Sequence, residues 1–213
     1  VKNSTNYVDI TGENFWVKGL IAKHHEEASA KGIRIIPSCG YDSIPSDLGV
    51  FYSAKALNKP IKRIESFHSW EGGASGGTLE TMFSMGDLDL GDEHLDPYLL
   101  NPKDSYTQEQ KEQSSDRVGI AKKNEINAWS GPFIMATANT RVVRRTEALL
   151  SLRQESYGSN FTYQEHALHN TWFSAFKSIV ITAISVLVLM SPLKRAVKPL
   201  SLIHISEPTR PYW

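Results

Sequence analysis

The stretch Pro37-Ser-Cys-Gly-Tyr-Asp-Ser-Ile-Pro-Ser-Asp-Leu-Gly49 decides the organisation of the chain. A short apolar run at 33–36 leads into it, and an apolar pattern with helical spacing at 48–57 leads out. The stretch therefore predicts a strand, a tight loop and a helix N-terminus. Gly40 permits a positive φ or a close backbone approach, and Pro45 suits the first helical turn. Four side chains can cap the free N–H groups of this helix start: Asp42, Ser43, Ser46 and Asp47.

A loop of this kind is where ligands bind in α/β proteins, outside the carboxyl ends of the strands. The helix N-terminus also offers free N–H groups and a partial positive charge to an anion. The alternative is an ordinary strand-to-helix turn with redundant caps, and spacing alone favours that alternative.

The residues before this stretch extend the same pattern. Residues 7–10 predict a short strand, and Asn14 can cap a helix that runs to Lys31 with Gly32 just beyond its end. His24 falls on the apolar face of that helix, which favours packing over catalysis. Strand, helix, strand and helix in succession predict a doubly wound parallel sheet. We therefore assign residues 1–59 to the C-terminal part of a Rossmann-type α/β domain.

Composition excludes some classes of function. The 213 residues carry 23 Lys and Arg against 23 Asp and Glu, so net charge gives no argument for nucleic acid as a partner. Cys39 is the only cysteine, so no internal disulfide forms. It could be a nucleophile, but no histidine partner is evident, and a structural role is favoured. The acidic residues at 87–93 lack the EF-hand pattern, and no metal site is expected.

Residues 60–199 predict an incomplete second domain of mixed α/β type. A strand at 61–70 leads into a glycine loop, and Thr78 can cap a helix. Residues 105–116 read as a solvated helix or as disorder, without chemistry. A further helix is expected over 141–157, capped by Asn139 or Thr140 and closed by Gly158. An alternating strand with Phe161, Tyr163 and Glu165 follows.

Two features of this second part suggest ligands. Arg141, Arg144 and Arg145 share one helical face, so they could bind phosphate or carboxylate or simply lie in solvent. The segment 179–190 carries no charge but is shorter than the roughly 20 residues that span a bilayer. Aromatic residues precede it and basic residues follow it, which suits an interfacial membrane segment. A buried helix or strand pair is the alternative.

Several motifs occur in an order that resembles the saccharopine dehydrogenase-like oxidoreductases. They are Tyr7-Val-Asp-Ile-Thr-Gly-Glu13, His25-Glu-Glu-Ala28, Gly40 to Gly49, Ser75-Gly-Gly-Thr78, Pro132-Phe133 and Arg141-Val-Val-Arg-Arg-Thr146. The resemblance covers about residues 6–195, with a divergent middle at 87–128. It implies a Rossmann domain followed by a mixed α/β domain. Bacterial relatives include trans-acting enoyl reductases of lipid synthesis, and eukaryotic relatives are associated with lipid droplets.

The resemblance also implies a function and a site. The function is NAD(P)-dependent oxidation or reduction in lipid or glycolipid metabolism, inside the cell, with a small-molecule or lipid substrate and with a lipid droplet or membrane as a second partner. The implied cofactor-binding residues are Asp9, Thr11, Gly12, Glu13, Gly40 and Asp42. The implied substrate-side residues are Ser75, Gly76, Gly77, Thr78, Arg141, Arg144 and Arg145. Tyr41 is a weak catalytic candidate, and packing is an equal alternative for it.

The family's phosphate-binding motif is not found, because no G-x-G-x-x-G follows a strand in this sequence. We therefore expect a fragment that binds no dinucleotide by itself, whereas the full-length protein would use NAD or NADP. Residues 200–213 resemble the translation of a sequencing adapter, and a non-native tail is expected there.

Two other functions remain open. The absence of a clear acid or base in the motifs favours a non-catalytic lipid-droplet or membrane scaffold that keeps the Rossmann shell. Saccharopine reductase activity on amino acids is less favoured, because only the three arginines could bind its carboxylates.

Overall fold

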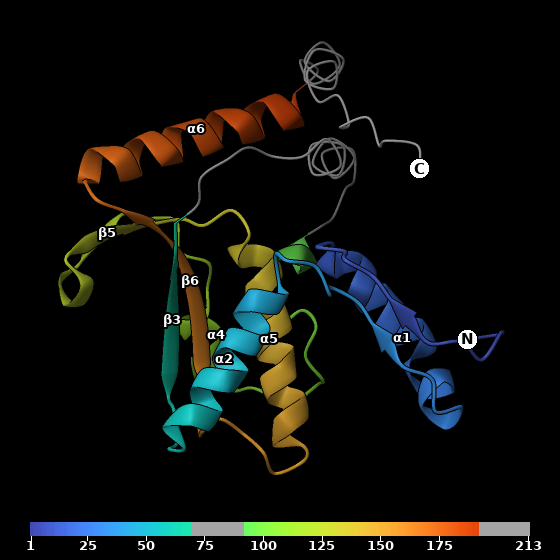
Figure 1. Ribbon diagram of the computed structural model, residues 1–213. Helices are drawn as coiled ribbons and strands as arrows, with labels where there is room; N and C mark the ends of the chain where they lie inside the picture. The colour runs from blue at the N-terminus through green and yellow to red at the C-terminus, as the bar shows by residue number, and fades with distance from the viewer. Residues whose placement is uncertain (70–91, 192–213) are drawn as a thin grey trace, which may run out of the picture. The chain divides into compact units, whose positions relative to one another are not determined.

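The computed structural model describes residues 1–69 and 92–191, which form parts of two compact units (Figure 1). The described residues of the first unit are 1–68, 92–119 and 132–167. Those of the second unit are 69, 120–131 and 168–191. Both units combine helices and strands, so the predicted α/β class is correct at that level. The boundary expected between residues 59 and 60 falls within the first unit.

The N-terminal part of the first unit is a β-α-β arrangement. Strand β1 (Tyr7–Val8) pairs in parallel with β2 (Ile35–Ile36), and α1 (Asn14–Ala30) connects them. Gly32 follows the helix end with φ of 64°, as predicted. The predicted cap was wrong, because Glu13 holds the N-cap position and Asn14 donates hydrogen bonds elsewhere.

The second helix begins earlier than its apolar pattern indicated. Helix α2 (Ile44–Leu57) starts with Ser43 in the N-cap position, and the Ser43 side chain makes no capping hydrogen bond. Asn58 ends the helix in the left-handed conformation, with φ of 45°. The polar residues at this helix start therefore have partners outside their own helix.

The core of the first unit lies between two helices and two parallel strands. Strand β3 (Arg63–His68) pairs with β6 (Thr162–His169), whose last two residues belong to the second unit. Helix α5 (Ala136–Ser151) lies beside α2, and both pack on these strands (Figure 1). The fully buried side chains that meet here are Val50, Val143, Tyr157, Phe161 and Tyr163. Their burial supplies the main apolar contribution to the stability of this unit.

Two predicted boundaries of α5 were wrong. The helix begins five residues before the expected start at Arg141, and it ends at Ser151 rather than near Gly158. Asn139 therefore lies in its first turn and does not cap it.

The segment between 92 and 116 is ordered by contacts that its composition did not predict. It contains a 3-10 turn (η1, Asp92–Leu95) and a short helix, α4 (Gln108–Gln113). Thr107 and Gln110 form a capping box at the start of α4, so the helical alternative is confirmed. The buried side chains Tyr98, Leu99 and Leu100 attach the segment to the first unit.

The second unit contains a hairpin and one long helix. Strand β4 (Ala121–Lys123) pairs antiparallel with β5 (Ala128–Gly131), and the 3-10 turn η2 (Asn124–Ile126) connects them. Helix α6 (Trp172–Met190) packs on β5 through Ala175, whose methyl group would lie 4.0 Å from a Cβ placed on Gly131.

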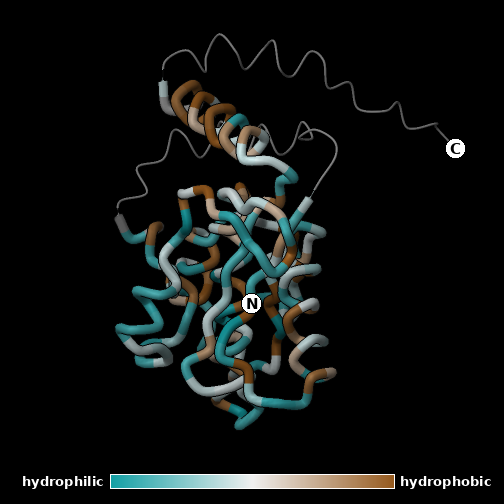
Figure 2. The backbone as a smooth tube through the Cα atoms, turned by 90° about the vertical axis from the view of Figure 1, so that its left-hand side faces the viewer, coloured by the Kyte–Doolittle hydropathy of each residue, from teal (hydrophilic) through white to brown (hydrophobic). Residues whose placement is uncertain are grey.

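Much of α6 consists of apolar residues, as the largely brown helix of Figure 2 shows, and eight of its apolar side chains are exposed. The exposed apolar residues are Trp172, Phe173, Phe176, Val180, Ile181, Ile184, Val186 and Leu187. The alternative that residues 179–190 are buried is therefore wrong for Val180, Ile181, Ile184, Val186 and Leu187. Within residues 1–69 and 92–191, no helix has the length and hydrophobicity needed to span a bilayer.

Replacing Gly49 with alanine should stabilise the protein. A Cβ at Gly49, in the interior of α2, would meet no heavy atom within 4 Å. Alanine should therefore raise the free energy of unfolding by about 1 kcal/mol through helix propensity alone. Urea denaturation measures the change.

Gly158 is the matched control, because a Cβ there would lie 2.5 Å from the carbonyl oxygen of Ile61. Gly158→Ala should lower the free energy of unfolding by about 1–3 kcal/mol. A destabilised Gly49→Ala variant would contradict the structure of α2 at this position.

Candidate functional site

Asp9 fixes the carboxyl ends of β1 and β2 to each other. Its Oδ1 accepts hydrogen bonds from the backbone N–H of Thr11 at 2.9 Å and of Ser38 at 3.1 Å. The backbone N–H of Cys39 donates to the Asp9 carbonyl at 2.7 Å. Oδ2 of Asp9 is buried and makes no hydrogen bond of standard geometry among the described residues. The Tyr7 phenol nevertheless interacts with this carboxylate, since a hydrogen bond to Asp9 raises the pKa of Tyr7. A ligand that donates to Asp9 at this strand edge would therefore compete with Tyr7.

The other predicted cofactor-side residues lie around this edge. A Cβ at Gly40 would lie 3.2 Å from the Cβ of Ile10, so glycine allows the two loops to approach closely. The Thr11 hydroxyl accepts a hydrogen bond from the N–H of Glu13. Gly12 and Asp42 are exposed. The structure thus brings together Asp9, Thr11 and Gly40, while their role in cofactor binding stays a prediction.

The structure does not support a catalytic role for Cys39 or Tyr41 at this edge. Tyr41 is 90% exposed, without a described hydrogen-bond partner. Burial raises the pKa of the Cys39 thiol, and the charge of Asp9 adds a smaller effect in the same direction. Less thiolate is therefore present for nucleophilic attack. The structural interpretation of Cys39 is therefore favoured.

A buried set of polar side chains, the Asn139 cluster, joins α2, α5, β3 and β6. Its members are Ser43, Ser46, Ser66, Asn139, Tyr163 and Glu165. The Ser43 hydroxyl donates to Oδ1 of Asn139 at 3.0 Å. Nδ2 of Asn139 donates to Ser46 at 3.4 Å and to Oε2 of Glu165 at 3.1 Å. The serines at the start of α2 are therefore used for contacts with α5 and not for capping.

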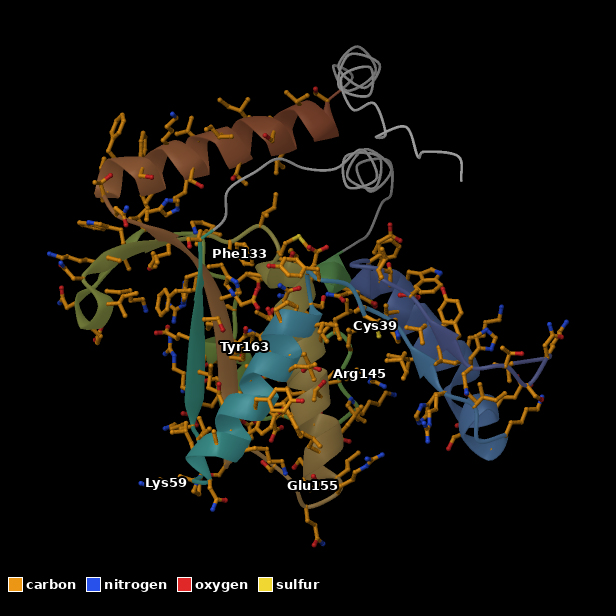
Figure 3. The ribbon with its side chains drawn as sticks, in the orientation of Figure 1. Cys39, Lys59, Phe133, Arg145, Glu155 and Tyr163 are labelled. Atoms are coloured by element: carbon orange, nitrogen blue, oxygen red, sulfur yellow. The ribbon has the colours of Figure 1, made fainter. Side chains whose placement is uncertain are left out.

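The carboxylate of Glu165 is the charged group of the Asn139 cluster. The Tyr163 hydroxyl donates to its Oε1 at 2.7 Å and also lies 2.9 Å from the hydroxyl of Ser66. Burial and the charge of Glu165 raise the pKa of Tyr163, so this phenol stays a neutral donor. Figure 3 labels Tyr163 on the strand that carries both residues.

His68 lies at the edge of the cluster, at the carboxyl end of β3. Its Nε2 is 3.8 Å from Oε1 of Glu165, and its ring stacks on Phe133 with centroids 4.5 Å apart (Figure 3). The His68 side chain is 28% exposed, whereas the Glu165 side chain is fully buried. The sequence predicted a strand over residues 61–70, but it gave no signal that pairs His68 or Ser66 with Glu165.

The three arginines bind acceptors from the chain itself. Arg141 donates to both oxygens of Asp116, at 2.6 and 2.7 Å. Arg144 donates to the carbonyl oxygens of Pro97, Ser114 and Tyr163. Burial lowers the pKa of Arg144 to about 10, which leaves the guanidinium charged at neutral pH.

Arg145 donates to the carbonyl of Leu100. The alternative that the basic cluster lies in solvent was wrong for Arg141 and Arg144, which are 1% and 2% exposed. Their assignment to the substrate side stays a prediction that these contacts do not support. The other substrate-side candidates, Ser75, Gly76, Gly77 and Thr78, lie outside the described residues.

In the part of the chain that the structure describes, no three side chains of His, Cys, Asp or Glu are grouped as ligands of one metal ion.

Comparison with known proteins relates the chain to oxidoreductases. It is 35% identical over 174 residues to a protein of Mycobacterium tuberculosis (strain ATCC 25618 / H37Rv) whose name, trans-acting enoyl reductase, is provisional. That match covers 76% of this chain and 41% of the relative. The chain is also 30% identical over 198 residues to the trans-acting enoyl reductase of Mycobacterium leprae (strain TN), covering 86% of this chain and 47% of the relative.

The chain thus spans less than half the length of these relatives. No family model matches the sequence, and no solved structure matches it. The narrower resemblance to saccharopine dehydrogenase-like proteins stays a prediction.

Asp47→Asn tests the electrostatics beside the Asn139 cluster. Burial raises the pKa of Asp47 to about 6, and a hydrogen bond from Thr146 partly opposes this. The folded state therefore disfavours the ionised carboxyl. The free energy of unfolding is highest below the unfolded pKa of about 4, and it decreases as the pH rises to about 6. Asparagine removes the charge and keeps an acceptor for Thr146.

The variant should be more stable than the wild type by about 2–3 kcal/mol near pH 8 and nearly equal to it near pH 4. Urea denaturation at both pH values measures this. Equal stabilities near pH 8 would show that Asp47 ionises freely in the folded protein.

Proposed function

We propose that this chain belongs to a nicotinamide-dependent oxidoreductase that reduces the carbon–carbon double bond of an enoyl substrate in lipid metabolism. The similarity to trans-acting enoyl reductases over 174 residues carries the proposal. The buried Oδ2 of Asp9 at the carboxyl edge of β1 and β2 supports it, because ligands of parallel sheets bind at this edge.

The residues at this edge fit the ribose or carboxamide end of a nicotinamide nucleotide. Both groups carry hydrogen-bond donors, from which Oδ2 of Asp9 could accept in place of the Tyr7 phenol, and Gly40 keeps the loop close to the strand end. A bound, reduced nicotinamide would supply the hydride for the reduction. The choice of NAD or NADP is not assigned to any residue of this chain.

The test is reduction of a medium-chain 2-enoyl thioester by the longest reading frame that contains this sequence, with NADH or NADPH as the reductant. Asp9→Asn should raise the KM for the nucleotide about tenfold, because one charged hydrogen bond is weakened. Asp104→Asn is the control, since Asp104 is an exposed carboxylate whose φ of 60° asparagine tolerates. Absence of turnover in the wild type with either nucleotide would contradict the proposed activity.

We also propose that α6 contacts a lipid surface. This contact is compatible with the enoyl reductase activity and with the non-catalytic scaffold. Eight exposed apolar side chains lie along this helix, and Trp172 and Phe173 stand at its start. Burial of such a surface in lipid is favourable at about 25 cal/mol per Å². Because aromatic side chains favour the membrane interface, the start of α6 suits a position near the headgroups.

Flotation with phospholipid vesicles measures this contact. Ile181→Asp together with Leu187→Asp should remove the protein from the floating fraction, because both side chains are more than half exposed and would carry charge into lipid. Leu152→Asp is the matched control, since Leu152 is 72% exposed but lies outside α6. A wild-type protein that stays folded and does not float would contradict the lipid contact.

A further inference from the structure

We propose that His68, held by Glu165, is the proton donor of the reduction. This inference rests on the proposed function and adds a named acid to it. The evidence is the position of an imidazole at the carboxyl end of β3, 3.8 Å from a fully buried carboxylate.

Within residues 1–69 and 92–191, no Lys or Arg side chain donates a hydrogen bond to Glu165. Its two oxygens accept hydrogen bonds from the Tyr163 hydroxyl and the Asn139 amide, which are both neutral donors. A buried carboxylate is costly unless a positive group compensates its charge. Arg144 contributes a favourable field, but its described hydrogen bonds go to carbonyl oxygens. His68 is the side chain that can pair directly with Glu165 when it is protonated.

The position of the His68 imidazole also favours this pairing. Its Nε2 is buried and makes no hydrogen bond within the described part of the chain. The ring lies flat on Phe133, with an angle of 1° between the two planes, so its orientation is restricted. A small approach would bring Nε2 within hydrogen-bond distance of Glu165, since catalytic hydrogen bonds are often long before substrate binds. Nδ1 would then be the nitrogen that offers a proton to a substrate.

The position along the strand supports contact with a ligand. Ser66 is the register partner of Glu165 in the parallel pair of β3 and β6, and His68 stands two residues further toward the carboxyl end. Ligands in parallel sheets bind outside this end. The 28% exposure of the His68 side chain leaves part of the ring accessible, whereas Glu165 is closed off.

The reaction balances with one hydride and one proton. The hydride from the reduced nicotinamide forms a C–H bond at the β-carbon of the enoyl thioester, and the nucleotide becomes oxidised. The electron pair of the double bond moves to the α-carbon, where it takes the Nδ1 proton of the His68 imidazolium. Neutral His68 then regains its proton from solvent.

A purely structural histidine is the alternative, and two measurements separate it from a proton donor. The first is the ¹⁵N NMR signal of Nε2 in the His68 ring, compared between the wild type and Glu165→Gln. Loss of the carboxylate should shift this signal, because a hydrogen bond to a charged acceptor is stronger than one to a neutral amide.

The second measurement is steady-state kinetics of His68→Gln in the enoyl thioester assay. The variant should lose about 10²–10⁴ in kcat, with the KM for the nucleotide unchanged. His25→Gln, on the exposed face of α1, should keep wild-type kcat. Circular dichroism checks that each variant is folded, and the kinetics of His68→Gln decide the proposal if Glu165→Gln does not fold.

Wild-type turnover that survives in His68→Gln would overturn the role of His68 while leaving the proposed function intact. An unchanged Nε2 signal in folded Glu165→Gln would overturn the pairing. No turnover in the wild type would contradict the proposed function and the role of His68 within it, even where NMR shows that the two side chains are coupled.

Discussion

The first unit depends on the buried amide of Asn139. Its Oδ1 accepts from Ser43, and its Nδ2 donates to Ser46 and Glu165, so one side chain joins α2, α5 and β6. Apolar packing sets how closely these elements approach, but it is not directional. The hydrogen bonds of Asn139 fix the relative positions of the elements, because each partner is buried and would lose free energy if left unpaired.

The β-α-β part could be predicted because its signals are local. Apolar runs produced the parallel strands, and Gly32 marked the end of α1 through its left-handed backbone. The start of α2 could not be predicted in the same way. A serine at a helix start can bond to the nearest backbone N–H or to a distant side chain, and only the tertiary structure shows that Ser43 and Ser46 bond to Asn139.

The candidate site shows the same limit. Asp9, Thr11 and Gly40 are near in sequence to the turns that place them, and the structure brings them together at one edge. Arg141 and Arg144 were predicted either to bind an anion or to lie in solvent, because helical spacing alone shows only that they share a face. Their acceptors come from residues 95–116 and from β6, and those pairings have no local signal.

The two buried charges of this region are compensated unequally. Arg144 gives hydrogen bonds to three carbonyl oxygens, whose dipoles surround the guanidinium without moving. Among the described residues, Glu165 receives hydrogen bonds from one hydroxyl and one amide, and Nε2 of His68 lies 3.8 Å from its Oε1. A fixed cation at this place would complete a structural ion pair, whereas an imidazole can both accept and donate a proton. The choice of histidine opposite a buried carboxylate therefore suits proton transfer better than stability, since a permanent partner would compensate Glu165 more fully.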